Sequence, residues 1–261
     1  MAHGLAAERT FRLTAFAERF AENAMAAFAF DYRNFGDSDG TPRNLVKPRR
    51  QIEDWESAID HVRTLEGIDR ERIALWGSSF SGGHIMVIAA RDPGISAIIS
   101  QVPFVNGASF AMHMGLKYVA QAIGAGLRDI LQMATFRGRY KVPVVSDPDA
   151  FAVLNTPECK AGYLGIVPQD SGWKNECPAA FLLTSALYRP TTYAKRVRCP
   201  ALVMLAEKDS LIPPDSVKKA AEKMKNSEVI SLPIGHFDIY LGEHYEMAVQ
   251  RQIDFLKKHL T

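Results

Sequence analysis

A chain of 261 residues is long enough for one large α/β domain, or for such a domain with an insertion. Its 31 basic and 29 acidic residues nearly balance, and no basic block or basic–aromatic stripe occurs, which argues against a nucleic acid as a partner. The three cysteines, Cys159, Cys177 and Cys199, are odd in number and form no C-x-x-C motif. They predict reduced thiols in a cytoplasm, and they argue against a disulfide framework or a zinc site.

No signal peptide is expected, because Glu8, Arg9 and Arg12 stand where the apolar part of such a peptide would run. Residues 94–116 contain no Asp, Glu, Lys or Arg, and that length could cross a membrane. Pro103 and several polar residues interrupt the segment, so we interpret it as a buried strand that leads into the wall of an apolar pocket. We therefore do not expect a membrane as a partner.

The first part of the chain predicts alternating helices and strands. Residues 7–22 place apolar side chains at i, i+3, i+4 and i+7, which is typical of an amphipathic helix. The apolar run 24–30 predicts a buried strand, and the turn-rich segment 31–40 predicts a loop. A second amphipathic helix is expected over 49–66, and a short apolar strand over 73–76.

The same alternation continues further along the chain. After a Gly/Ser-rich turn at 77–83, we expect an apolar helix over about 85–90 and a strand over 95–102. Strands are predicted again at 201–206 and 228–232, each followed by a helix. Strands that alternate with helices predict a mostly parallel sheet with helices on both faces. Such a sheet binds its ligands beyond the carboxyl ends of its strands.

Residues 104–198 interrupt this alternation, and we expect them to form an insertion in a core made of residues 1–103 and 199–261. The insertion begins with a predicted helix over about 112–133 and continues with a series of prolines. Its many aromatic and Met side chains predict a helical lid over an apolar acyl or aryl pocket. The residues that we expect to line this pocket are Phe104, Met112 and Trp173.

The pattern Gly77-x-Ser79-x-Ser81 lies between a predicted strand and a predicted helix. A strand that turns sharply into a helix strains its turn residue, so small residues two before and two after it are favoured. The turn residue projects above the sheet at the positive end of the helix, which suits a serine nucleophile. Ser79 is preferred to Ser81 because Gly77 stands where the strand ends. An ordinary loop or a phosphate-binding turn is the alternative interpretation.

Two candidate partners for Ser79 follow later strands of the predicted sheet. A serine hydroxyl needs a base within hydrogen-bonding reach, and the base needs an orienting carboxylate. Asp209 directly follows one predicted strand and His236 follows the last, so both are expected at the same edge as Ser79. We predict that His236 acts as base and then as acid, and that Asp209 orients it. Glu207 is an alternative acid, closer to the body of the strand.

An oxyanion formed at Ser79 needs two backbone N–H donors. Phe80 is expected to supply one, as the residue after the nucleophile. Leu5 is expected to supply the other, because it lies in the loop before the first helix. Neither a nucleotide-binding glycine motif nor an H-E-x-x-H metal motif occurs, and we expect no cofactor and no metal.

Taken together, these motifs resemble the α/β-hydrolase superfamily, and most of all its dienelactone-hydrolase-like, acyl-peptidase-like and polyketide-transferase-like branch. The resemblance spans the whole chain apart from the less specific insertion. Ser81 departs from the more common glycine at that position. The segments that carry the resemblance are Ala2-His3-Gly4, the loop 31–40, Leu75 to His84, Glu207 to Pro213, and Gly235-His236-Phe237.

In the family fold, strands precede the His-Gly motif, and one of them lies inside the sheet, beside the strand that ends at Tyr32. Here only Met1 and Ala2 precede His3. A missing central strand would leave backbone N–H and C=O groups unpaired, which is costly. We therefore expect residues upstream of Met1, another chain in the gap, or a sheet that has closed up. We favour the first, and we expect the chain as given to be poorly soluble or to form sheet between molecules.

The resemblance implies a serine hydrolase that cleaves an ester or thioester of a small apolar acyl substrate through an acyl-serine intermediate. An acyl or polyketide transferase that uses the same triad is an alternative. A non-catalytic ligand-binding protein with this fold is a third, which the intact triad disfavours. A small-molecule acyl substrate is the expected partner, and pairing with a second copy of the chain is left open.

Overall fold

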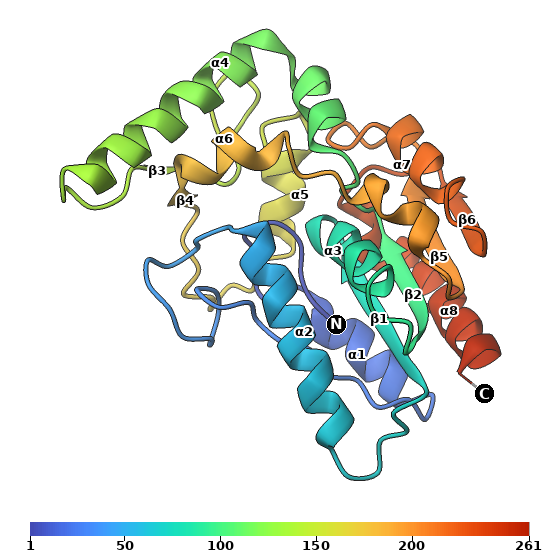
Figure 1. Cartoon of the computed structure of the whole chain (residues 1–261). Helices are drawn as coiled ribbons and strands as arrows, with labels where there is room; N and C mark the ends of the chain where they lie inside the picture. Colours follow the sequence, from blue (N-terminus) through green and yellow to red (C-terminus); the bar gives the residue numbers. More distant parts are fainter. Residues whose placement is uncertain (261) are drawn as a thin grey trace.

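Four short segments form one parallel sheet at the centre of the molecule (Figure 1). The computed structural model describes residues 1–260. The strands lie in the order β1-β2-β5-β6, and each neighbouring pair is parallel. They are β1 (Ile73–Ser78), β2 (Ile95–Gln101), β5 (Ala201–Ala206) and β6 (Ser227–Leu232). Their carboxyl ends therefore meet at one edge, as the sequence predicts.

Helices cover both faces of the sheet (Figure 1). On one face, the ring of Trp76 packs against Phe16, and its indole N–H donates to Gln252 at 2.8 Å. On the other face, one helix is buried along its whole length, because its residues are all apolar or small apart from His84. The helices are α1 (Leu13–Ala21) and α8 (Gly242–His259) on the first face, α2 (Pro48–Thr64) and α3 (Phe80–Ala89) on the second, and α7 (Pro214–Ala221), which packs on β5 and β6.

The insertion folds mainly into helices and turns above the carboxyl edge of the sheet (Figure 1). Its longest helix is α4, and a break at Gly115, with φ of 83°, divides this helix in two. The elements of the insertion are α4 (Gly107–Ala134), β3 (Lys141–Val142), α5 (Cys159–Gly165), β4 (Cys177–Pro178), η1 (Ala179–Phe181), α6 (Leu182–Ser185), η2 (Pro190–Thr192) and η3 (Ala194–Arg196). A further short turn, η4 (Asp238–Tyr240), follows β6.

The prediction of a buried strand over 24–30 is wrong. These residues form no strand, and all of them are half-buried or exposed. Met1 and Ala2 lie between this segment and β1: the N–H of Phe30 donates to the carbonyl of Met1, and Ala2 pairs with Gly77 of β1. Two residues supply too few ladder bonds to hold 24–30 as a strand.

The sheet has not closed up on this side. Beyond Met1, a slot of about 360 Å³ lies between residues 24–30 and β1, and most of the side chains that line it are apolar. The terminal amino group of Met1 donates to the carbonyl of Phe28 at 2.7 Å. Because it is buried, the pKa of this amine is lowered to about 5.

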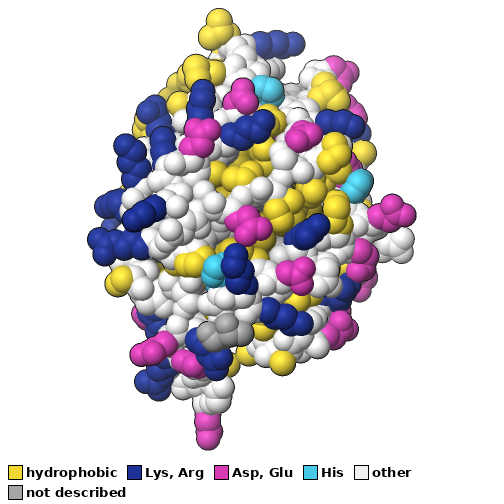
Figure 2. All heavy atoms as spheres, turned by 90° about the vertical axis from the view of Figure 1, so that its right-hand side faces the viewer, with side chains coloured by type: hydrophobic (Ala, Val, Ile, Leu, Met, Phe, Trp, Pro, Cys, Tyr) yellow, Lys and Arg dark blue, Asp and Glu magenta, His cyan; other side chains and the backbone are white. Residues whose placement is uncertain are grey.

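The outer surface over β6, α7 and α8 carries Lys, Arg, Asp and Glu side chains around smaller apolar areas (Figure 2). This mixture agrees with the near balance of charges in the sequence. Within residues 1–260, no helix has both the length and the apolar character needed to cross a bilayer. The three cysteines are free thiols, and Cys159 and Cys177 are buried.

Candidate active site

Ser79 occupies a sharp turn between β1 and α3. Its backbone adopts φ of 53° and ψ of −115°, a combination that is rare for a residue other than glycine and that often marks a functional position. A Cβ atom on Gly77 would lie 2.5 Å from the carbonyl oxygen of Ser81, so the turn requires glycine there. The N–H of Ser79 donates to Gln101 at 2.8 Å, which fixes the turn to the end of β2.

Ser81, the alternative nucleophile, lies below this turn. Its side chain is fully buried, and its hydroxyl lies 2.7 Å from the hydroxyl of Tyr32 and accepts a hydrogen bond from the indole of Trp55 at 3.2 Å. This hydroxyl takes part in a buried network between the loop after residue 30, α2 and α3. Its surroundings therefore favour a structural role for Ser81.

His236 and Asp209 meet Ser79 at the carboxyl edge of the sheet. The Nε2 atom of His236 lies 3.1 Å from Oγ of Ser79, and Nδ1 lies 2.7 Å from Oδ2 of Asp209. The other carboxylate oxygen of Asp209 accepts from the N–H groups of Leu211 and Ile212 at 2.8 and 2.7 Å. The structure thus brings together the three side chains that the sequence proposed as a triad.

The surroundings of His236 favour a base that can hold a proton. Burial lowers the pKa of His236, but the charge of Asp209 and its hydrogen bond outweigh burial, so the pKa is raised above its ordinary value. Asp209 has a fixed orientation because its second oxygen is bound by two backbone donors. The arrangement can take a proton from Ser79 and return it to a departing group.

The loop that contains Gly4 and Leu5 lies directly against Ser79. A Cβ atom on Gly4 would lie 3.1 Å from the Cβ of Ser79, so the backbone approaches closely. The imidazole Nδ1 of His3 lies 2.9 Å from the carbonyl oxygen of Gly4, and the carbonyl of Leu5 accepts from the hydroxyl of Tyr163 at 2.9 Å. These contacts hold both carbonyl groups of the loop in place.

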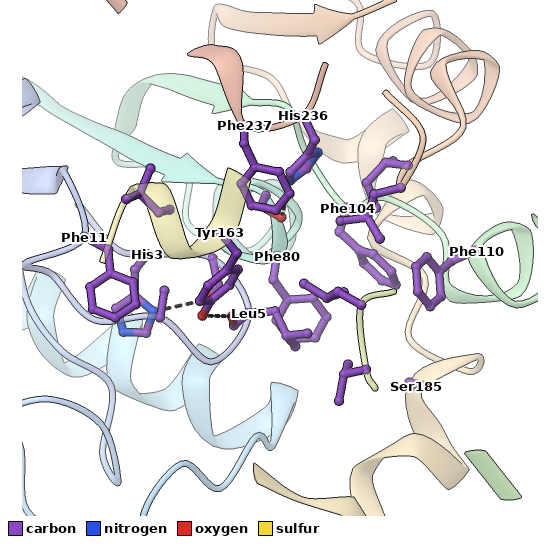
Figure 3. Close-up of a pocket in the computed structure, with 18 of the residues that line it drawn as sticks. His3, Leu5, Phe11, Phe80, Phe104, Phe110, Tyr163, Ser185, His236 and Phe237 are labelled. Atoms are coloured by element: carbon purple, nitrogen blue, oxygen red, sulfur yellow. Dashed lines mark hydrogen bonds between the residues drawn. The ribbon is translucent and has the colours of Figure 1, made fainter. Parts of the chain in front are cut away.

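A small apolar cavity of about 50 Å³ opens beside Ser79 and His236. Aromatic side chains from the sheet edge and from the insertion converge on it (Figure 3). Phe80 and Leu5, the two expected oxyanion donors, belong to its lining, and so does Phe104. The other main contributors are Phe110, Tyr118, Leu154, Tyr163, Phe181 and Phe237.

Two of the predicted pocket residues do not line this cavity. Met112 is 76% exposed, because it lies on the outer side of the turn of α4 that precedes the break at Gly115. Trp173 lies outside the cavity and packs on Phe11 and Tyr163, which line it. Its indole N–H donates to the carbonyl of Ala6 at 2.9 Å. Both predictions rested on residue type alone, which does not show where a side chain points.

Glu158 was not predicted, although it connects the loops of the triad. One carboxylate oxygen accepts from the N–H and the hydroxyl of Ser210, each at 2.7 Å. The other accepts from the N–H of His236 at 2.7 Å. A Cβ on Gly235 would lie 2.3 Å from this carboxylate, so a side chain there would displace Glu158 from its present position. No local motif marks Glu158, because its partners lie 52 and 78 residues further along the chain.

Glu158 also acts on His236 through its charge. The groups that raise the pKa of His236 are Asp209, which bonds Nδ1, and Glu158, which faces the backbone of the histidine. We expect Glu158→Gln to lower the pKa of His236, because a neutral amide no longer stabilises the imidazolium. An NMR titration of the imidazole measures this directly.

The matched control is Asp147→Asn, since Asp147 is an exposed carboxylate of the same insertion that pairs with Lys160. This variant should leave the titration of His236 unchanged. An unchanged or raised pKa in Glu158→Gln would show that the carboxylate only fastens the loops and does not act through its charge.

The chain matches the family model described as "Alpha/beta hydrolase family" over residues 1–246. It is 40% identical to the quorum-quenching protein AidA of Acinetobacter baumannii, over 99% of this chain and 85% of that protein. It is 29% identical to the thiohydrolase aneE of Aspergillus aculeatus, over 100% of this chain and 85% of that protein.

Solved structures share the fold. The complex of DcsB with its substrate analogue matches with a TM-score of 0.87 and 22% identity, over 99% of this chain and 90% of that one. The α/β hydrolase GrgF from Penicillium matches with a TM-score of 0.81 and 23% identity, over 100% of this chain and 89% of that one. Sequence and structure agree: this chain belongs to the α/β-hydrolase family, with a reduced four-stranded sheet.

Proposed function

We propose that this protein is a serine hydrolase that cleaves an ester or thioester of a small apolar acyl substrate through an acyl-serine intermediate. The observation that carries the proposal is the unbroken hydrogen-bonded series from Asp209 through His236 to Ser79, placed beside an apolar cavity. Membership of the α/β-hydrolase family supports the same reaction class.

In the first half of the reaction, Oγ of Ser79 attacks the carbonyl carbon of the acyl group. Its proton passes to Nε2 of His236, which lies 3.1 Å away. Asp209 keeps the Nδ1–H of the ring directed at itself and stabilises the imidazolium that forms. The C–O or C–S bond then breaks, and the leaving alcohol or thiol takes the proton from His236.

The negative charge on the carbonyl oxygen in this step needs two N–H donors. We assign them to Phe80, at the N-terminus of α3, and to Leu5, in the loop against Ser79. Removing one such donor typically lowers kcat by about 10²- to 10³-fold. Tyr163 supports this assignment indirectly, since its hydroxyl binds the carbonyl of Leu5 and so limits rotation of that backbone.

In the second half, water replaces the leaving group. His236 takes a proton from the water while its oxygen attacks the acyl carbon, and the ester bond to Ser79 breaks to release a carboxylic acid. The proton returns to Ser79. Because His236 must be neutral to act as a base in both halves, turnover should fall as pH drops below its raised pKa.

The lining of the cavity supports an apolar acyl group as the substrate. Most of the side chains that converge on it are aromatic or aliphatic, and none of those that the insertion supplies is charged. Two relatives bear the name thiohydrolase, at 29% and 26% identity. An apolar acyl thioester or ester therefore fits the site better than a charged acyl group does.

Acyl transfer is the second candidate, and a specific feature favours it. The acyl group would be enclosed by the insertion, which would limit access of water to the acyl-serine and give another acceptor time to react. Relatives named polyketide transferases cover 92% or more of this chain at 24 and 26% identity. The chemistry of Ser79 is the same in both cases, and only the acceptor differs.

The name of the 40% identical relative, quorum-quenching protein AidA, widens the range of substrates to test. Small signalling molecules that contain an ester or thioester bond and an apolar group therefore belong beside simple esters and thioesters in a substrate panel.

Ser79→Ala should abolish covalent labelling by a fluorophosphonate probe and lower kcat on the order of 10⁶-fold, because the attacking oxygen is lost. Ser81→Ala is the matched control, since it removes a hydroxyl two residues away that faces Tyr32 and Trp55. It should retain labelling. Labelling is read by intact-protein mass, with circular dichroism to verify that both variants are folded.

The reverse pattern, in which Ser81→Ala abolishes labelling and Ser79→Ala does not, would reassign the nucleophile. Failure of the folded wild-type protein to react with the probe would favour the third interpretation, a ligand-binding protein without catalysis.

A series of p-nitrophenyl esters of rising chain length should show a preference for apolar acyl groups longer than acetate. Phe110→Ala should move the optimum to longer chains, because Phe110 forms part of the cavity wall. Met112→Ala, on the exposed side of the same helix, should leave the profile unchanged. Repeating the assay with an acceptor alcohol and analysing the products separates hydrolysis from transfer. A preference confined to acetate or to charged acyl groups would contradict the apolar pocket.

A further inference from the structure

The second part of α4 carries an apolar seam that faces solvent. Its members follow each other at spacings of four and three residues, which is the heptad pattern by which one helix packs against another. Leu116 is 90% exposed, Leu127 is 57% exposed and Ile123 is 46% exposed. The exposed seam consists of Leu116, Ala120, Ile123, Leu127, Ile130 and Ala134.

The opposite side of α4 is already occupied by the body of the protein. Tyr118, Ala122 and Ala125 are buried there, and the hydroxyl of Tyr118 donates to the carbonyl of Val153. Asp129 is fully buried and accepts hydrogen bonds from the side chain of Arg139 and from the N–H of Ala180. The exposed seam is therefore separate from the face by which α4 packs against the rest of the protein.

A helix that is apolar on both sides is normally covered on both. In Figure 1, α4 lies at the outer edge of the molecule, with α6 beside it on one side and no element on the other. The seam lacks the mixed charges seen on the face in Figure 2. Between residues 116 and 134, the exposed charged side chains are Lys117 and Arg128, and both lie outside the seam.

We propose that the exposed seam packs antiparallel against the exposed seam of a second copy of this chain. The centre of the pairing is at residue 125, so that Ile123 of one copy meets Leu127 of the other. Ala120 then meets Ile130, and Leu116 meets Ala134. Every layer combines a Leu or Ile from one copy with an apolar partner from the other.

The seam itself selects the antiparallel direction. A parallel pair would place Ala120 against Ala120 and Ala134 against Ala134. Two layers would then hold only alanine, and the other four would each hold two large side chains, so the packing would be uneven. A parallel pair would also align the two helix dipoles in the same direction, whereas an antiparallel pair opposes them.

The size of the surface fits a stable pair. The seam runs along about 27 Å of helix, at 1.5 Å per residue. Leu131 and Met133, which flank it, are 64% and 51% exposed. The seam and its flanks together present on the order of 800 Å² per copy, which is the share that each partner contributes to a standard interface. Because α4 also supplies Phe110 and Tyr118 to the cavity, pairing of two copies through the seam would stabilise the position of the insertion over the cavity.

The test is the molar mass in solution, measured by light scattering during size exclusion over a range of concentrations. One copy has a mass of 28.9 kDa, and the wild-type protein should show twice that mass. Leu127→Lys places a charge in the central layer and should give the mass of one copy. Gln121→Lys is the control, because Gln121 is exposed on the same helix but lies outside the seam. It should remain paired, and circular dichroism should show both variants to be folded.

The direction of pairing is tested with single cysteines in a Cys199→Ser background. Ile123→Cys and Leu127→Cys, co-expressed with different tags, should form a disulfide between the two chains under mild oxidation. Neither variant alone should do so. A wild-type monomer at all concentrations would overturn the proposal, as would a monomer that binds neutral lipid vesicles through this seam. A disulfide in each variant alone would overturn the antiparallel arrangement.

Discussion

Two carboxylates hold His236, one at its ring and one at its backbone, and the chemistry that we propose depends on this arrangement. Asp209 binds the Nδ1 atom of the imidazole, and Glu158 accepts from the backbone N–H of His236. The first carboxylate follows β5, whereas the second comes from the insertion. The insertion is thus more than a cover over the cavity, because it helps to set the position and the basicity of the histidine that faces Ser79.

Much of the site follows from local physical rules. The turn at Ser79 needs glycine at position 77, where a side chain would collide with the next helical turn, and that requirement is visible in the sequence. Asp209 and His236 could be predicted because parallel strands end at one edge, so residues that follow them meet. Most of the sheet was predictable because β1, β2 and β5 are short, mainly apolar runs, whereas β6 at the edge contains Glu228 and two serines.

The remainder depends on contacts that no local pattern encodes. Glu158 lies in a Pro-rich segment, and its role arises from residues more than 50 positions away. Met112 and Trp173 are residue types common in pockets, but Met112 is exposed on the outer side of α4 and the indole of Trp173 bonds to Ala6. Residues 24–30 look like a buried strand because they are apolar, yet a strand also needs a neighbour to bond along its length.

The central claim is that an acyl group becomes attached to Ser79 and that His236 drives both halves of the reaction. The most direct measurement is peptide mass spectrometry after an acid quench within the first turnover of a p-nitrophenyl ester. We expect the acyl mass on the peptide that contains Ser79, and no acyl peptide with His236→Ala. An acyl group on any other residue, or release of p-nitrophenol in the first turnover with no acyl peptide at all, would contradict the account.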